Sequence, residues 1–492
     1  MAASEAVPYA KTGGLADVVG ALAIELTKSG HGVTLLMPGY RGRETGRARQ
    51  SAMRLSIPVD GKSLDVTVEE EIVPVTGAAH QLRVLFVRYD PYFDRPGLYQ
   101  QDHHDYPDNL DRFILFCRAV LEIVRHLIGA REEKVDVLHL HDWQTALCAV
   151  YLKTFPYEYR GLEQLKVVLT LHNLGYQGIF PGQQFAKTGL PPALFSPSGL
   201  EFYGSVNCLK GGIIFSDVVS TVSPTYAKEI MTAEYGCGLE GVLASRADGV
   251  KGIANGIDVA AWNPENDPYL AVQYTVSNLS GKQACKRALQ QELGLPNRDV
   301  PLLAAIGRLT FQKGFDLLLE VIPELMLLDT QIVVLGMGDH HLEQQFIAIK
   351  ARYPDRIGLS LGFDEGMAHR IEAGSDMLVM PSRYEPCGLS QLYSLRYGTI
   401  PIVRRTGGLA DTVIPFRPST IRAGSATGFH FSDASSDSLL SVLLLSLHAY
   451  KDSQTWQSLI RAGMKVDLSW DQSAKLYASV YRELQRGEKR EN

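Results

Sequence analysis

The feature that most constrains the fold is an eight-residue segment that occurs twice in the chain. Residues 12–19 read TGGLADVV and residues 406–413 read TGGLADTV, with seven of the eight positions identical. Each copy stands beside an apolar, β-rich run and a helical pattern. Convergence of two loops on one local structure is an alternative, but we favour a duplication. The sequence therefore predicts an α/β protein built from two similar doubly wound, Rossmann-like domains.

Short apolar runs along the whole chain support this fold class. They are almost continuous in Val, Ile and Leu, which is typical of parallel strands buried on both faces. Longer helical patterns separate them, as in βαβ units. The predicted strands are residues 33–38, 134–141, 166–173 and 217–223 in the first half, and 302–308, 331–336, 357–362, 376–382 and 400–405 in the second.

Composition suggests where the domains meet. Residues 255–270 are rich in Asn, Pro and Asp, as expected of a crossing between domains. From residue 469 onward, apolar residues have the spacing of one amphipathic helix. We predict domains over 1–250 and 251–468, and a terminal helix over 469–492 that packs back on the first domain. Only MAAS precedes the first glycine loop, so either the first strand is very short or the true start lies upstream.

Charge and cysteine content exclude several classes of protein. The net charge of −6 argues against non-specific binding of nucleic acid, which requires a basic surface. No run of about 18 apolar residues is present, so no membrane span is expected. The first residues do not resemble a signal or transit peptide. Six cysteines are scattered singly, which predicts reduced thiols in a cytoplasmic protein.

The first repeat copy forms part of a candidate anion site. Gly13 and Gly14 allow the backbone to approach a ligand closely, and the following helix presents free N–H groups at its N-terminus. Lys11 adds a positive charge suited to a phosphate. A tight turn with a surface lysine is the alternative interpretation.

Two cations follow the predicted strand 302–308. Arg308 stands at the carboxyl end of that strand, where open α/β sheets bind ligands, and Lys313 follows in the next loop. Two permanent positive charges suit a departing pyrophosphate, whose negative charge grows as it leaves. Solvated surface charge remains the alternative for this pair taken alone.

A third segment, residues 385–390, lies between a predicted strand and a predicted helix. Gly388, Leu389 and Ser390 place backbone amides at the helix N-terminus, where they can hold an anion. Glu385 stands at the strand end and can accept hydrogen bonds from sugar hydroxyls. Cys387 is interpreted as a small wall of the site rather than a nucleophile, since no His stands beside it in the sequence.

The sequence does not favour a metal site or another nucleotide-binding motif. His139 and His141 alternate onto one face of a strand, and residues 102–105 read DHHD, but no further ligand cluster with suitable spacing accompanies either. No phosphate-loop or nucleophile-elbow motif occurs, and the glycine pattern at 336–341 ends in His341. No Asp-x-Asp metal clamp is present either. The sequence predicts no metal.

Together these segments resemble the bacterial glycogen synthases and plant starch synthases, retaining glycosyltransferases of the GT-B class. The matching stretches run through nearly the whole chain. They are KTGGLADVVGALA at 11–23, LHLHDWQTAL at 138–147, LHNLGYQGIFP at 171–181, TVSPTYAKEI at 221–230, NGID at 255–258, GRLTFQKGFDLL at 307–318, the long stretch at 381–413 and SWDQSA at 469–474.

The resemblance implies roles for individual residues. The donor-phosphate positions of the family correspond to Lys11, Gly14, Arg308 and Lys313, with backbone amides from Leu389 and Ser390. Its glucose contacts fall on His172, Asn255, Glu385, Cys387 and Gly388. Asp142 matches an acidic position near the reacting sugar, Phe363 an aromatic that stacks on adenine, and Tyr99, less closely, a cleft tyrosine.

The resemblance also implies the reaction. Two domains facing across a cleft are expected to transfer glucose from ADP-glucose to the non-reducing 4-hydroxyl end of an α-1,4-glucan, with retention of configuration and without a cofactor or metal. The expected partners are this donor and a glycogen or starch acceptor. Sucrose or trehalose-phosphate synthases lack the opening motif at 11–23. A non-catalytic glucan-binding protein is the alternative from another class, although all the charged positions are present.

Overall fold

The computed structural model describes residues 1–42, 50–102, 104–131, 134–362 and 364–487. The chain forms two compact units. The first contains Met1–Val222, Ala227–Asn255 and Trp470–Asn492, and the second contains Ser223–Tyr226 and Gly256–Ser469. These units differ from the predicted ranges 1–250 and 251–468 by a few residues, and the terminal helix belongs to the first unit.

The second unit is built on a six-stranded parallel sheet of order β16-β15-β14-β17-β18-β19. Counted along the chain, this order is 3-2-1-4-5-6, which is the order of dinucleotide-binding folds. The order reverses between β14 and β17, and open α/β sheets bind ligands at the carboxyl ends of the strands at such a point. The strands are β14 Leu302–Ile306, β15 Gln331–Gly336, β16 Ile357–Leu361, β17 Met377–Met380, β18 Ile400–Arg404 and β19 Phe429–Phe431.

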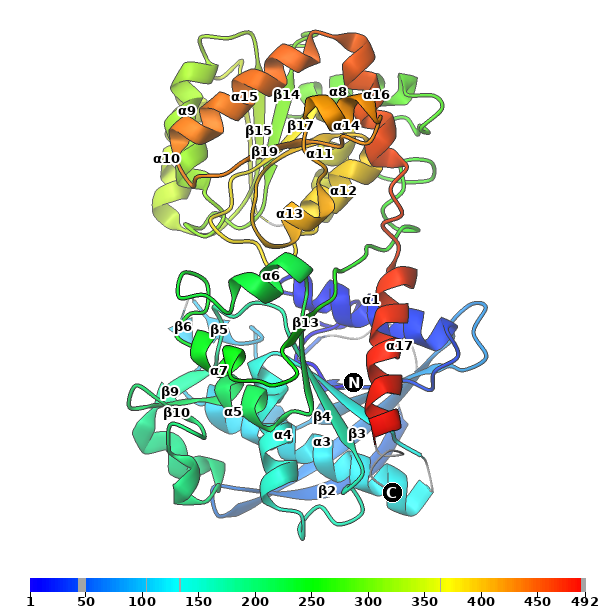
Figure 1. Cartoon of the computed structure of the whole chain (residues 1–492), viewed down its shortest axis with the longest axis vertical. Helices are drawn as coiled ribbons and strands as arrows, with labels where there is room; N and C mark the ends of the chain where they lie inside the picture. Colours follow the sequence, from blue (N-terminus) through cyan, green and yellow to red (C-terminus); the bar gives the residue numbers. More distant parts are fainter. Residues whose placement is uncertain (43–49, 103, 132–133, 363, 488–492) are drawn as a thin grey trace. The chain divides into compact units, whose positions relative to one another are not determined.

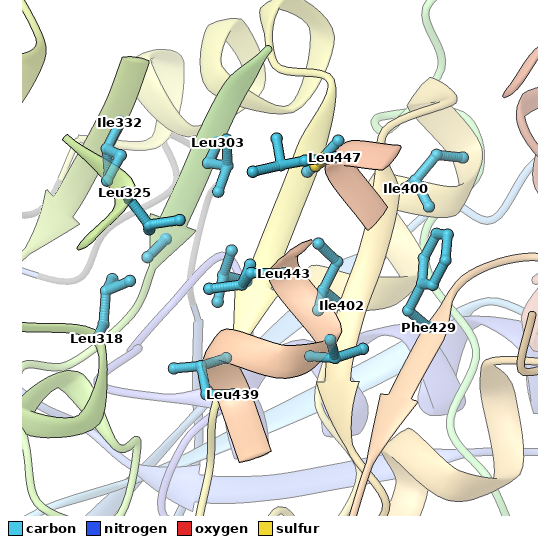
Figure 2. Close-up of a cluster of buried hydrophobic side chains, with 14 of the residues drawn as sticks. Leu303, Leu318, Leu325, Ile332, Ile400, Ile402, Phe429, Leu439, Leu443 and Leu447 are labelled. Carbon is cyan, nitrogen blue, oxygen red and sulfur yellow. The ribbon is translucent and has the colours of Figure 1, made fainter. Parts of the chain in front are cut away.

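Successive residues of these strands are buried on opposite faces of the sheet. Leu303 packs with the helices α9 (Phe315–Leu325) and α15 (Ser436–Tyr450), as Figure 2 shows. Its neighbour Leu302 belongs to a second cluster on α8 (Ser280–Glu292) and α11 (Glu365–Gly374). Burying one such side chain contributes about 1.5–3 kcal/mol. Burial on both faces explains why the strand sequences are continuously apolar.

The first unit contains a longer sheet joined through Ala2. Ala2 forms parallel bridges to Leu36 in β1 and to Leu140 in β7. Its N–H donates to the His139 carbonyl at 2.8 Å. The bridges connect the set β4, β1 to the set β7, β8, β12, β13, all parallel, so the strand order again reverses beside the first strand. These strands are β1 Thr34–Pro38, β4 Leu82–Arg88, β7 Val137–His141, β8 Lys166–Leu171, β12 Val218–Thr221 and β13 Val250–Gly252.

An antiparallel extension of this sheet was not predicted. β2 (Gln50–Val59) pairs with β3 (Lys62–Val73), which pairs with β4. β3 alternates buried and partly exposed residues, as expected when only one face is covered. Before the first glycine loop, the described residues pair with this sheet through the isolated bridges of Ala2.

Helices cover the sheets of both units. In the first unit α1 (Gly14–Lys28) lies beside the terminal helix α17 (Trp470–Gly487), visible in blue and red in Figure 1. A hydrogen bond of 2.8 Å between His139 Nδ1 and Tyr481 Oη joins α17 to β7. Among the described residues, no helix is both long enough and apolar enough to cross a membrane.

The remaining elements complete the two units. They are α2 Asp90–Phe93, α3 Asn109–Arg131, α4 Trp143–Thr154, α5 Cys208–Phe215, α6 Pro224–Glu229, α7 Glu240–Ala244, α10 His340–Arg352, α12 Ser390–Tyr397, α13 Gly407–Thr412, α14 Pro418–Arg422, α16 Ser453–Met464, η1 Gly182–Thr188, η2 Pro192–Leu194, β5 Gln100–Gln101, β6 His104–Asp105, β9 Ile179–Pro181, β10 Glu201–Phe202 and β11 Ser205–Asn207.

Candidate active site

The loop after β14 carries both predicted cations of the second unit. Arg308 is exposed two residues beyond the strand, and Lys313 immediately precedes Gly314, the N-cap of α9. Gly314 has φ 70°, and a Cβ there would lie 2.1 Å from the Pro381 carbonyl oxygen. Only glycine permits this approach, because it lacks the side chain and tolerates positive φ. The approach holds the Lys313 loop against the segment that follows β17.

Lys313 and Glu385 form an ion pair in this arrangement. Lys313 Nζ lies 2.6 Å from Glu385 Oε2, and Ser382 Oγ donates to the same oxygen at 3.0 Å. The Glu385 side chain is 6% exposed, whereas that of Lys313 is 21% exposed. The pair joins the ends of β14 and β17, the two strands between which the order reverses. Both residues were predicted from the sequence, but their contact was not.

The second repeat copy, residues 406–413, packs against the backbone of the Glu385 segment. A Cβ on Gly407 would lie 1.9 Å from the Glu385 carbonyl oxygen, and one on Gly408 would lie 2.2 Å from that of Cys387. The Gly408 N–H donates to the Glu385 carbonyl at 3.1 Å. Because these glycines have no side chains, α13 packs in direct contact with the backbone of residues 385–387.

The helix α12 begins beside this segment. Gly388 has φ 75°, and the next residues, Leu389 and Ser390, form the N-terminal end of the helix. The first N–H groups of a helix have no partner within it, so this end can hold an anion. Gln391 is fully buried and donates to the carbonyls of Cys387 and Gly388, which holds the turn in place. Cys387 itself is buried and is not in a disulfide.

In the first unit, Glu5 organises the glycine loop. Its Oε1 accepts from Thr12 Oγ1 at 2.7 Å and from Tyr99 Oη at 2.6 Å, and the Thr12 N–H donates to Oε2. Tyr99 Oη also lies 2.7 Å from Ser4 Oγ. Glu5 is 3% exposed, and burial together with the nearby carboxylate raises the pKa of Tyr99. Glu5 was not predicted as a site residue, because no local sequence pattern marks it.

Lys11 lies in the same loop and forms an ion pair at the start of α1. Lys11 Nζ lies 2.7 Å from Asp17 Oδ1. The helix begins at Gly14 after an extended Gly13, and no side chain caps it. An uncapped N-terminus beside a lysine suits an anion.

Asp142, at the end of β7, has two unusual properties. Its backbone has φ 55°, which costs about 1–3 kcal/mol for a residue other than glycine. Burial raises its carboxyl pKa to about 7, against the lowering effect of backbone N–H groups from His172 and Asn173. Its Oδ1 accepts from the His172 N–H at 2.7 Å. Strain combined with a shifted pKa is characteristic of functional positions.

A row of three buried histidines ends at His172. His172 Nε2 lies 2.9 Å from His141 Nδ1, and the His141 ring packs against His139 at a centroid distance of 4.2 Å. Burial lowers the pKa of His172 to about 3 and lowers the pKa of the other two, so all three rings are neutral near pH 7. His172 was predicted from the sequence, but its contact with His141 was not.

The row does not have the properties of a metal pair. Both ring nitrogens of His139 are engaged, Nδ1 with Tyr481 Oη and Nε2 with Thr170 Oγ1 at 2.6 Å. Within the part of the chain that the structure describes, no group of three or more His, Cys, Asp or Glu side chains is arranged to hold a metal ion. His103, in the second candidate segment, lies outside the described residues.

Asn255 and Phe363 are the other two predicted residues. Asn255 is 9% exposed, and its Oδ1 is buried without a hydrogen-bond partner among the described residues. A buried acceptor of this kind can take a ligand hydroxyl. Phe363, predicted to stack on adenine, lies outside the described residues. The predicted residues divide between the two units, and we call those of the first unit the first-unit cluster (Lys11, Gly14, Asp142, His172 and Asn255) and those of the second the second-unit cluster (Arg308, Lys313, Glu385, Cys387, Gly388, Leu389 and Ser390).

Comparison with known proteins shows the class and the family. Residues 1–245 match the starch synthase catalytic domain, and residues 287–461 match glycosyl transferases group 1. Two Rossmann-like units with these clusters therefore define a GT-B glycosyltransferase. The sucrose-phosphate synthase of Thermosynechococcus elongatus shares this fold at 18% identity and a TM-score of 0.59, over 99% of this chain and 98% of that one.

The relatives that are more similar in sequence are synthases of glucans. The chain is 44% identical to the glycogen synthase of Koribacter versatilis over 98% of its own length and 96% of that protein. It is also 44% identical to that of Thermotoga maritima, over 97% of each. The catalytic domain of starch synthase IV from Arabidopsis thaliana, bound to ADP and acarbose, matches at 36% identity and a TM-score of 0.88, over 98% of each chain. The chain belongs to the glycogen synthase and starch synthase family.

Proposed function

We propose that this glucosyltransferase uses ADP-glucose to extend the non-reducing end of an α-1,4-glucan, with retention of configuration. The observation that carries the proposal is the Lys313–Glu385 pair, placed where the strand order of the second unit reverses. The ADP bound to the Arabidopsis relative supports an adenine nucleotide as the donor. The six cysteines, none of them in a disulfide, fit a cytoplasmic location.

The second-unit cluster is assigned to the donor. Arg308 and Lys313 bind the diphosphate and stabilise its growing negative charge as the C1–O bond to phosphate breaks. The N–H groups of Leu389 and Ser390 add partial positive charge at the start of α12. Glu385 accepts hydrogen bonds from glucose hydroxyls. These cations perform the charge stabilisation that a metal performs elsewhere, so no metal is required.

In the first-unit cluster, Lys11 and Gly14 are assigned to the donor phosphate. The other residues of this cluster are assigned to the sugar. Because its pKa is about 3, His172 is a neutral imidazole at pH 7 and serves as a hydrogen-bonding group rather than a general acid. Asp142, ionised above a pKa of about 7, stabilises positive charge on the sugar in the transition state. The acceptor 4-oxygen then bonds to C1 on the face that the phosphate leaves, and its proton passes to the departing phosphate oxygen.

The test is incorporation of glucose into glycogen by the purified chain. ADP-glucose and UDP-glucose are compared in parallel, each with and without EDTA. Incorporation from ADP-glucose that EDTA leaves unchanged is the expected result. Preference for UDP-glucose contradicts the donor assignment, and loss in EDTA contradicts the metal-free mechanism. A folded sample that binds glycogen without incorporating glucose from either donor is a glucan-binding protein instead.

A further inference from the structure

A strained tyrosine lies at the tip of a small hairpin in the first unit. β10 and β11 pair antiparallel, and Tyr203 and Gly204 connect them with φ 50° and 79°. Two positive φ values are typical of a type I′ turn, in which Asn, Asp or Gly is usual at the first position. The left-handed conformation costs a residue with a Cβ about 1–2 kcal/mol.

The strain is not offset by burial of the ring. Tyr203 is 84% exposed, which leaves it among the most exposed large side chains of the described residues. The Gly204 N–H donates to Glu201 Oε1 at 2.8 Å, a contact that any first turn residue allows. Folding alone therefore does not explain the tyrosine, and strain kept at an exposed aromatic indicates a function.

The exposed ring is nevertheless braced. Phe202 and Tyr203 contact each other edge to face, with ring centroids 4.7 Å apart. A Cβ on Gly238 would lie 2.8 Å from Phe202 and 3.5 Å from Tyr203, so both rings rest on that glycine. At the turn, the Gly204 carbonyl approaches Gly182 so closely that a Cβ there would lie 2.4 Å from the oxygen. A ring held in this way loses little entropy on binding a ligand.

The hairpin is also connected to the loop that leaves His172. β11 pairs with β9, which begins seven residues after His172 in the chain. Gln177, in the intervening loop, accepts from Asn207 Nδ2 at 2.6 Å and donates to the Cys237 carbonyl at 3.1 Å. Two more exposed side chains lie on this connection, Tyr176 at 51% and Ile179 at 48% exposure.

We propose that Tyr203 is a stacking platform for an α-1,4-glucan chain, a secondary site that holds the polymer beside the reacting end. The inference rests on the proposed function, which makes the acceptor a long neutral polymer. An aromatic face packs well against the C–H face of a glucosyl unit, and a braced isolated ring suits that ligand. A stable protein partner would require an interface of about 1,000 Å² or more, whereas the polar residues Glu201 and Ser205 lie two positions before and after Tyr203.

The experiment replaces Tyr203 by Asn and measures binding to glycogen without any donor, by retardation in glycogen-containing gels. Asn tolerates the left-handed turn, so the variant is expected to fold with an unchanged or higher Tm. Retardation should weaken about tenfold, and the KM for glycogen should rise by a similar factor. The KM for ADP-glucose, and kcat on maltotriose, should stay unchanged. Tyr203→Trp should retain binding, since it keeps an aromatic face.

Tyr157→Asn is the matched control, because Tyr157 is 85% exposed at another surface turn of the same unit. Equal retardation of the wild type and Tyr203→Asn overturns the proposal, as does an equal loss in the Tyr157 control. Incorporation of glucose by a wild type that glycogen gels do not retard also overturns it and leaves the proposed function standing. If retardation depends on Tyr203 but the chain incorporates no glucose, the stacking site at Tyr203 is supported and the proposed function is refuted.

Discussion

Lys313 Nζ and Glu385 Oε2 lie 2.6 Å apart although 72 positions separate them in the chain. The glutamate is buried and the lysine is partly exposed, so the lysine is the member that a diphosphate can reach. In the proposed reaction, the donor competes for this lysine. The carboxylate then becomes available to the hydroxyls of the glucosyl group.

Lys313→Ala should lower kcat by about 100- to 1,000-fold, because a cation that stabilises the leaving diphosphate is lost. Glu385→Gln should lower it by a similar factor while keeping the acceptor for Ser382 Oγ. Steady-state kinetics with ADP-glucose measures both, and circular dichroism checks the fold. Lys475→Ala is the control, since Lys475 forms an exposed ion pair with Asp471 on α17 and should leave activity unchanged. Near-normal turnover of the Lys313 variant would remove it from the mechanism.

Asp142→Asn should separate stability from activity. The folded-state pKa of about 7 lies above the unfolded value near 3.9, so the folded protein binds the proton more tightly. The cost of burying the charge is therefore absent below about pH 4, grows as pH rises, and is fully present above about pH 7. Asn carries no charge and keeps an acceptor for the His172 N–H. Thermal melts should show a Tm gain over the wild type at pH 8 that shrinks at pH 5.

The same Asp142 variant should lose at least tenfold in kcat at pH 8, where the wild-type carboxylate is ionised. A variant that gains stability but loses activity is the expected outcome for a functional position. A Tm gain independent of pH would contradict the raised pKa, and full activity would contradict the role in the transition state.

His141→Ala should reduce kcat/KM by about tenfold, because the 2.9 Å contact that orients the His172 ring is lost. Asn at this position can place a polar atom near the site of Nδ1 and should restore part of the activity, whereas Leu should not. This rescue distinguishes orientation of His172 from mere packing. Turnover that is equally reduced in the Asn and Ala variants, with equal loss of Tm, would indicate a purely structural role.

Asn255→Ala should leave stability unchanged or raise it by up to about 1 kcal/mol, because it removes an acceptor that is buried without a partner in the described structure. The KM for ADP-glucose should rise about tenfold if that acceptor takes a ligand hydroxyl. Donor titrations at saturating glycogen and urea unfolding provide the two measurements. An unchanged KM would place Asn255 outside the donor site.

The repeat and the apolar runs predicted much of the fold. Residues 302–308 and 331–336 have strand sequences because both faces of the sheet are buried, and this property is local. Glycines at strand ends were visible in the sequence, and Gly314, Gly388 and Gly407 have the positive φ values that favour glycine. The antiparallel strands β2 and β3 were not predicted, since their half-exposed pattern is weaker and their pairing depends on the turn between them.

The contacts that make the site could not be predicted in the same way. Glu5 bonds to Tyr99, 94 positions away, and His141 meets His172, 31 positions away, because β7 and β8 are neighbours in the sheet. Nothing in a short window of sequence specifies which strands are adjacent. The same holds for Gly407 and Gly408, whose close contact with residues 385–387 arises from the packing of α13.

The sequence by itself determined most of the parallel strands, the positions of the glycine loops and the identity of the charged residues at the strand ends, because each depends on a few neighbouring side chains. Only the tertiary structure decided that Lys313 pairs with Glu385, that Glu5 holds the first glycine loop and that Asp142 is buried enough to titrate near pH 7. These properties depend on the order of strands within each sheet and on the exclusion of water, and both are set by the packing of distant parts of the chain.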